Sequence, residues 1–233
     1  MTLVFTVPGA VTSPIEGSLT LPSIGATGLI SRYHATNTQA LDIGDTVTTL
    51  ADWEDTGYDL AASGGPVTVQ EDSAGRYLDF SAGGTENILT SGALSAQPDQ
   101  MSLAALVYLA ATPASGVQFF QARVGRLTLS ALSDGKIGAY DGGSAFPRSA
   151  VATKPGWFRV IGTFDRTGTT GAVSITVNGA TTVGDASPST QDWTFGLRSN
   201  LTLGLRLRDA AVFDHILDSE EIAAVDAALA AQL

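Results

Sequence analysis

The sequence predicts an all-β domain: a two-sheet antiparallel sandwich of the jelly-roll type, with an extended N-terminal arm and one short C-terminal helix. Many short runs are rich in β-branched or aromatic residues and are bounded by Gly, Pro, Asn, Asp or Ser. Strands do not alternate with helical patterns, and no internal repeat of about 20–50 residues is visible. The one convincing amphipathic helix lies within residues 214–233. A strand-rich body closed by a single late helix favours a sandwich.

The strands follow one another at short intervals, separated by turn residues. Asp134–Gly135 and Asn178–Gly179 each stand between two such runs, which is typical of two-residue hairpin turns. The expected strands cover residues 28–35, 46–53, 67–70, 76–81, 101–110, 117–122, 125–132, 136–140, 157–165, 172–177, 193–197 and 201–213.

The C-terminal helix has clear boundary signals. Asp218 or Ser219 can cap its first turn, and Asp218 with Glu221 has the spacing of a capping box. The apolar residues Ile222, Val225 and Leu229 then fall on one face. We expect this face to pack on a sheet edge or against the body of the domain.

Residues 1–27 differ from the rest of the chain. They contain three prolines, and Glu16 is their only charged residue. Short alternating runs at 3–7 and 18–22 predict extended segments with one buried face. Because an apolar arm is costly to leave in water, we expect it to pack on its own domain or on another subunit. The predicted organisation is therefore an arm over 1–27 and one sandwich domain over 28–233.

Composition excludes several classes of function. The net charge of −11 leaves no basic field for nucleic acid or anionic lipid. The chain has no cysteine, which excludes disulfides, thiolate metal sites and a catalytic cysteine. No apolar stretch is long enough to predict a transmembrane helix. Pro8 and the absence of a basic start argue against a secretory signal, so we expect synthesis in the cytoplasm.

The surface is expected to be poor in charge. Charged residues make up 15% of the chain, well below the roughly 25% typical of soluble domains. A surface of this kind is often covered in part by neighbouring molecules. We therefore expect a homo-oligomer.

Three segments together resemble a known superfamily. They are residues 50–84, residues 156–179, which end in Asn-Gly, and residues 205–225, which contain the run from His215 to Ile222. Their order resembles the laminin-G-like, concanavalin A-like jelly-roll superfamily, over about residues 28–230. The resemblance implies two stacked antiparallel sheets with a concave face. Lectins, carbohydrate-binding modules, glycosidases, adhesion domains and phage virion proteins share this fold, so it leaves the function open.

Sugar binding requires an aromatic platform beside planar polar groups. The loop that follows the strand 136–140 offers both kinds of residue, and so does a polar stretch before residue 193. The candidate ligand-binding residues are Tyr140, Asp141, Phe146, Arg148, Asp192 and Trp193. Core packing is the alternative interpretation for each aromatic residue, and we expect Trp53 and Trp157 to be core residues.

An acidic loop is the candidate metal site. Asp52, Asp55 and Asp59 could supply the oxygen ligands that calcium prefers. The alternative is that Asp55 to Gly57 forms a simple turn. No other cofactor is expected.

Enzymatic chemistry finds no support in the sequence. A glycosidase needs two carboxylates that flank the scissile bond. The glycosidases of the resembled superfamily carry the pattern E-x-D-x-x-E on one strand, and no predicted strand shows it. His34 and His215 belong to no ligand-spaced motif, and we expect His215 to be a partly exposed turn residue. We therefore predict no catalytic residue.

Arg206 and Arg208 alternate with Leu205 and Leu207 on the closing strand, which is the pattern of a half-buried strand. We expect the two arginines to be solvated, or to meet acidic residues of a neighbouring subunit.

The interpretation that we favour at this point is a non-enzymatic structural virion protein of a tailed phage: a capsid decoration, head fibre, spike or tail-associated protein. The fold is usually extracellular, yet no secretion signal is present, and phage particles are released by lysis. Residues 1–27 would contact other virion proteins, and the sandwich would bind host surface glycan. One alternative is a carbohydrate-binding or adhesion module of a bacterial protein. The other is a glycan-cleaving enzyme.

Overall fold

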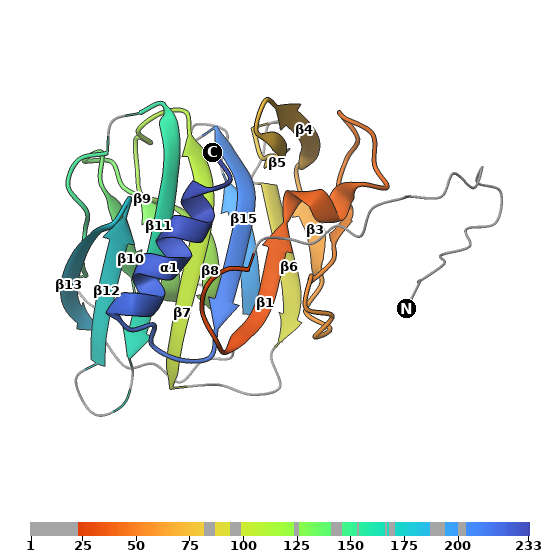
Figure 1. Ribbon diagram of the computed structural model, residues 1–233. Helices are drawn as coiled ribbons and strands as arrows, with labels where there is room; N and C mark the ends of the chain where they lie inside the picture. The colour runs from red at the N-terminus through yellow and green to blue at the C-terminus, as the bar shows by residue number, and fades with distance from the viewer. Residues whose placement is uncertain are drawn as a thin grey trace.

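Two antiparallel sheets lie face to face, and one helix covers the outside of one of them (Figure 1). The predicted all-β sandwich with a single C-terminal helix is confirmed. The computed structural model describes residues 23–81, 87–93, 99–123, 126–140, 146–152, 154–165, 167, 171–186, 194–199 and 204–233. In this part of the chain, no helix has the length and apolar character needed to cross a membrane.

The larger sheet has eight strands in the order β13-β12-β11-β7-β15-β5-β4, and β1 pairs with β15 beside β5. Its strands are β1 (Leu29–His34), β4 (Thr68–Asp72), β5 (Gly75–Asp79), β7 (Gln100–Leu109), β11 (Gly156–Asp165), β12 (Gly171–Val177), β13 (Ala180–Ala186) and β15 (Leu205–Phe213).

The smaller sheet has seven strands in the order β10-β9-β8-β14-β6-β3-β2. Its strands are β2 (Thr49–Leu50), β3 (Leu60–Gly64), β6 (Asn87–Ala93), β8 (Val117–Arg123), β9 (Arg126–Ala131), β10 (Ile137–Tyr140) and β14 (Thr194–Ser199). A short 3-10 helix, η1 (Ala35–Thr38), follows β1.

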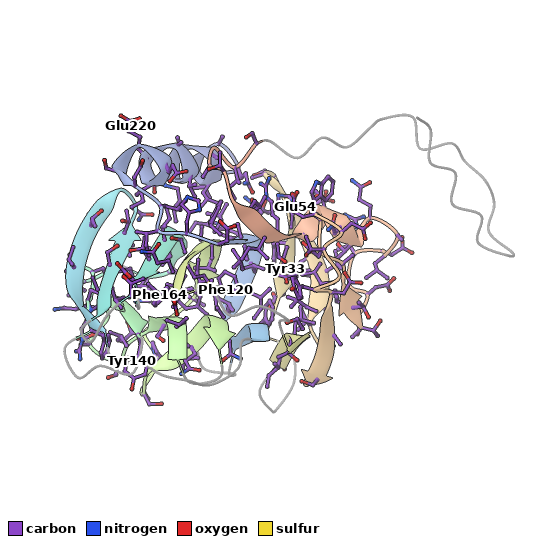
Figure 2. The ribbon with its side chains drawn as sticks, turned by 90° about the horizontal axis from the view of Figure 1, so that it is seen from below. Tyr33, Glu54, Phe120, Tyr140, Phe164 and Glu220 are labelled. Atoms are coloured by element: carbon purple, nitrogen blue, oxygen red, sulfur yellow. The ribbon has the colours of Figure 1, made fainter. Side chains whose placement is uncertain are left out.

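The main core lies between the sheets, and a second core lies under the helix. On β7, Leu103 and Val107 face the seven-stranded sheet, whereas Ala104 and Leu106 face the helix. Because both faces of this strand are buried, its sequence is an almost continuous apolar run. The labelled Phe120 and Phe164 lie between the two layers (Figure 2).

Helix α1 (Ser219–Ala230) begins with the predicted capping box. Asp218 accepts hydrogen bonds from the N–H groups of Glu220 and Glu221, at 2.8 and 2.9 Å. Val225 and Leu229 are fully buried against the eight-stranded sheet, so the predicted apolar face is confirmed.

The second core also holds the end of the predicted arm. Ile24 is buried in it, and Gly25 lies directly against Ala224 of the helix. Residues 1–22 lie outside the described part of the chain.

Some strand predictions are wrong. The run 46–53 contains only the two-residue strand β2, and the strands β3 and β6 were not expected. Four of the five residues of β3 are exposed, so the strand needs few apolar side chains. Both predicted hairpin turns form. Asn178 and Gly179 have φ values of 50° and 84°, as a two-residue type I′ turn requires, whereas the turn at Asp134–Gly135 has three residues, between Leu132 and Lys136.

Candidate functional site

The outer face of the seven-stranded sheet carries a row of residues that we call the front row: Tyr140, Thr128, Gln121 and Gly196. They are cross-strand neighbours on β10, β9, β8 and β14, in that order. The residues that follow or precede them along these strands face the core, so the row faces outward. Figure 2 shows Tyr140 on the side of the molecule opposite Glu220 of α1.

A second layer of side chains lies over the Tyr140 end of the front row, and from here on we count it as part of the front row. The ring of Phe146 meets the ring of Tyr140 edge to face, with 5.2 Å between the centroids. The guanidinium carbon of Arg148 lies 4.4 Å from the ring centroid of Phe146. Nη1 of the same arginine lies 3.3 Å from Oδ2 of Asp134. A Cβ at Gly138 would lie 2.9 Å from the Phe146 ring, so the missing side chain makes room for it.

The middle of the front row is buried and polar. Gln121 is 3% exposed, and its Oε1 is a buried acceptor without a hydrogen-bond partner. A Cβ at Gly196 would lie 2.8 Å from Nε2 of Gln121, so a side chain at this position would displace the end of the glutamine. An unsatisfied buried acceptor costs about 1–3 kcal/mol, which is the free energy that a ligand or water hydroxyl would recover.

Three of the six predicted ligand-binding residues meet here: Tyr140, Phe146 and Arg148. Asp141, Asp192 and Trp193 lie outside the described residues. Gln121 and Thr128 were not among the predicted residues, although polar residues that recur among apolar ones on neighbouring strands are the signal of a shared outer face.

A second row crosses the outer face of the eight-stranded sheet, and we call it the helix-face row. It consists of Trp157, Tyr108, Arg206 and Asp79, which are cross-strand neighbours on β11, β7, β15 and β5. The guanidinium carbon of Arg206 lies 4.8 Å from the ring centroid of Tyr108 and 5.1 Å from that of Tyr77. Its Nε lies 3.8 Å from a carboxylate oxygen of Asp79.

The helix-face row corrects two expectations. Trp157, expected in the core, is half-buried on the outer face. Arg208, expected to be solvated, has a side chain that is 2% exposed, stacks on Trp157 at 4.5 Å and donates to Asp72 at 2.6 Å. Leu205 and Leu207 do face the core as expected.

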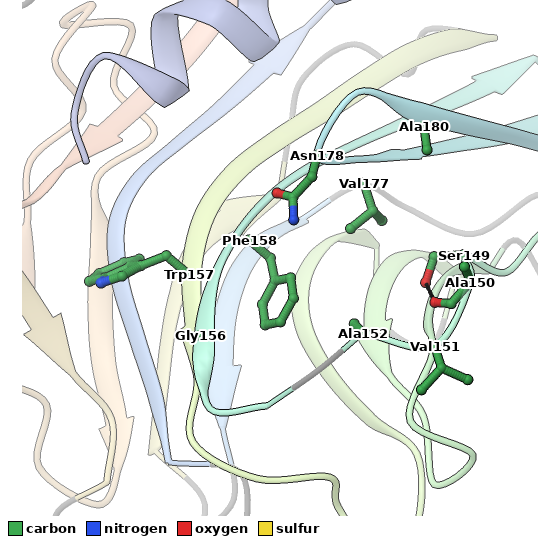
Figure 3. A pocket seen from close by; sticks show the side chains of 10 residues that line it. All are labelled: Ser149, Ala150, Val151, Ala152, Gly156, Trp157, Phe158, Val177, Asn178 and Ala180. Carbon is green, nitrogen blue, oxygen red and sulfur yellow. Dashed lines mark hydrogen bonds between the residues drawn. The ribbon is translucent and has the colours of Figure 1, made fainter.

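A shallow pocket of about 390 Å³ opens between the segment 149–152, the start of β11 and the turn between β12 and β13 (Figure 3). Its lining is mostly apolar and includes Phe158 and Val177. Asn178 contributes a side-chain amide, whose Oδ1 accepts the N–H of Arg159 at 3.0 Å. Among the lining residues that the structure describes, none has an acidic or basic side chain.

The predicted acidic loop uses its carboxylates internally. Oδ1 of Asp52 accepts the N–H of Arg32 at 2.9 Å, and Oδ2 accepts the hydroxyl of Ser31 at 3.2 Å. Asp59 accepts the N–H of Asp52 at 2.8 Å, and Asp55 has a positive φ of 54°. Over the described ranges, no group of three or more His, Cys, Asp or Glu side chains could hold a metal ion. This geometry lends the calcium prediction no support.

The two histidines have opposite environments. Burial lowers the pKa of His34. Burial also acts to lower the pKa of His215, but hydrogen bonds with Glu221 and Asp214 outweigh it and raise that pKa. The side chain of His215 is 31% exposed, as expected for a turn residue. The hydroxyl of Ser102 donates a hydrogen bond to the backbone carbonyl of His215 and not to the imidazole ring. These two residues therefore do not form a nucleophile–base pair.

Comparison with known proteins addresses the fold. No family model matches the chain, and no curated protein matches it. Among solved structures, it is similar to Trypanosoma rangeli sialidase in complex with sialic acid, with a TM-score of 0.61 and 13% identity over 93% of this chain. It is also similar to the binding domain of botulinum neurotoxin serotype D, with a TM-score of 0.60 and 15% identity over 86% of this chain.

A further match is the binding domain of botulinum neurotoxin DC in complex with SialylT, with a TM-score of 0.62 and 14% identity over 89% of this chain. The chain spans 35% of the sialidase, 51% of the serotype D domain and 52% of the DC domain. At this level of identity, the comparisons establish a shared β-rich fold.

Proposed function

We propose that this protein is a carbohydrate-binding module of the laminin-G-like, concanavalin A-like type, and that its front row binds the sugar. The observation that carries the proposal is the unsatisfied Oε1 of Gln121 in the same row as Tyr140, beside Phe146 and Arg148. Two structural neighbours are described with sialic acid or SialylT bound, which supports a ligand of this kind.

Each part of the front row has a physical role in this proposal. The rings of Tyr140 and Phe146 offer apolar surface to the C–H face of a pyranose. The guanidinium of Arg148, whose side chain is 44% exposed, offers several planar donors to ring hydroxyls. A sugar hydroxyl would donate to Oε1 of Gln121 once the row opens to admit it.

The virion role remains a prediction. The comparisons lend no support to a phage particle, to the contacts of residues 1–27 with other virion proteins, or to a homo-oligomer. The alternative of a carbohydrate-binding or adhesion module agrees better with the neighbours. We do not propose hydrolysis, because Asp134 is the one carboxylate described at the front row, whereas most families of glycosidase use two.

A glycan array followed by calorimetric titration of the full chain tests the proposal. We expect saturable binding that weakens about tenfold in Tyr140→Ala and in Arg148→Ala, because each substitution removes roughly 1–1.5 kcal/mol of contact. Val183→Ala is the control, since Val183 is 70% exposed on β13 of the other sheet. Unchanged affinity in both front-row variants, or no saturable binding to any glycan, would overturn the proposal.

A further inference from the structure

We propose that the helix-face row is a second ligand site, for an uncharged pyranose, so that the module binds saccharide on two opposite faces. The inference adds a site to the proposed function and rests on it for the class of ligand. Nothing in the front row contributes to the helix-face row, because the two sheets and the core separate them.

The helix-face row is long enough to contact a short oligosaccharide. Trp157, Tyr108, Arg206 and Asp79 are direct cross-strand neighbours, so one line of side chains crosses four strands of the sheet. Neighbouring strands lie about 4.8 Å apart, and four strands therefore span about 14 Å, roughly the length of two or three linked sugar rings. Side chains fixed on strands hold such a platform more rigidly than side chains on loops.

The helix-face row is partly exposed to solvent. The second core under α1 contains Leu106 and Ala211 of this face, and Trp157 packs against this core. The main-chain carbonyl of Gln232 accepts a hydrogen bond from Arg208 at 2.6 Å. Trp157 and Tyr108 remain half-buried, and the side chain of Arg206 is 39% exposed. The row therefore presents aromatic and guanidinium groups to solvent.

Neighbouring side chains hold the ring of Trp157 in place. Arg208 lies against Trp157, with its guanidinium carbon 4.5 Å from the ring centroid. Tyr77 meets Trp157 edge to face at 6.3 Å, and Tyr108 does so at 5.7 Å. These contacts fix the tryptophan ring before any ligand arrives, which lowers the entropy cost of binding.

The charges around the helix-face row favour an uncharged ligand. Arg206 and Arg208 are balanced by Asp79 and Asp72, so the patch carries two positive and two negative side chains. A hydroxyl-rich, uncharged ring uses both the donors of Arg206 and the acceptors of Asp79 without leaving either charge unpaired.

The test separates the two sites. A front-row double variant, Tyr140→Ala with Arg148→Ala, is titrated as the full chain with neutral tetrasaccharides of glucose, mannose and galactose. The acidic probe is 3′-sialyllactose. We expect the double variant to keep binding at least one neutral tetrasaccharide, with a change in tryptophan fluorescence that disappears in Trp157→Phe. Adding Arg206→Ala or Tyr108→Ala should weaken that binding at least tenfold, whereas Thr181→Ala, an exposed position on β13, should not.

The possible outcomes distinguish the two proposals. Loss of all neutral binding in the front-row double variant would overturn the helix-face site and leave the proposed function intact. Wild-type binding that is abolished by Arg206→Ala and unaffected by the front-row changes would support the helix-face site and overturn the front row. Residual binding to 3′-sialyllactose alone would overturn the neutral ligand class. If Tyr108→Ala does not fold, Arg206→Lys decides, because it keeps the charge but removes the planar donors.

Discussion

Replacing Asp209 by alanine should destabilise the domain strongly. Asp209 is fully buried on β15, and its carboxylate accepts hydrogen bonds from Nε and Nη2 of Arg32 at 3.1 and 2.5 Å. It also accepts one from Nε2 of Gln232, at 2.8 Å. The side chain of Arg32 is only 4% exposed, so the substitution leaves a guanidinium inside the protein without its counter-charge. It also removes one of the hydrogen bonds by which Gln232 joins the end of α1 to the sheet.

The expected loss is about 3–5 kcal/mol, the usual effect of stranding one partner of a buried ion pair. The free energy of unfolding of a typical protein is about 5–15 kcal/mol, so this loss is a large fraction of the total. Equilibrium urea unfolding at pH 7 would measure it. The double variant Arg32→Met with Asp209→Leu removes both charges and should recover most of the loss. A loss below about 1 kcal/mol in Asp209→Ala, or a double variant no more stable than the single one, would refute this reasoning.

Three smaller predictions concern single side chains. Gln121→Met keeps the shape of the side chain but removes the unsatisfied acceptor. Urea unfolding should therefore show unchanged stability or a gain of up to about 1 kcal/mol, while titration should show weaker sugar binding. A less stable variant that still binds sugar normally would contradict the proposed role of Gln121. Burial lowers the pKa of His34 below its ordinary value of 6.5. As the pH falls below 6.5, the unfolded chain therefore binds a proton at His34 before the folded protein does. The contribution of neutral His34 to stability is thus present above pH 6.5 and is lost as the pH falls. Comparing unfolding at pH 7.5 and 5.5 should show a smaller decline in His34→Gln than in the wild type, and equal declines would count against this role of His34. Asp218→Ala removes the N-cap of α1 and should cost about 1 kcal/mol of stability in thermal or urea unfolding, whereas the neighbouring exposed Glu220→Ala should cost less.

The fold could be predicted because local signals agreed with it. The capping box at Asp218, the turn at Asn178 and the alternation of Leu205 with Leu207 each depend on residues close together in the chain. The strand β3 could not be predicted in the same way. Its sequence, Leu-Ala-Ala-Ser-Gly, has no β-branched residue, and pairing with β6 and β2 determines its conformation.

The sites could be predicted only in part, because they depend on register between strands. Tyr140, Phe146 and Arg148 are close in sequence, so a single loop could suggest them. Gln121 joins Tyr140 only through the pairing of β8, β9 and β10. The burial of Arg208 could not be predicted either, because it depends on contacts with Trp157, Asp72 and the main-chain carbonyl of Gln232, which are distant in the sequence.

The long ladder between β7 and β11 has a practical consequence for experiments. These strands pair over ten residues each, and β7 contributes side chains to both cores. A structure joined in this way should melt as one cooperative unit, so occupancy of either surface would raise the same transition temperature. A thermal-shift screen would therefore detect any saccharide that binds the native protein but would not show which site it occupies. Locating the contact requires a residue-resolved method, such as chemical-shift mapping.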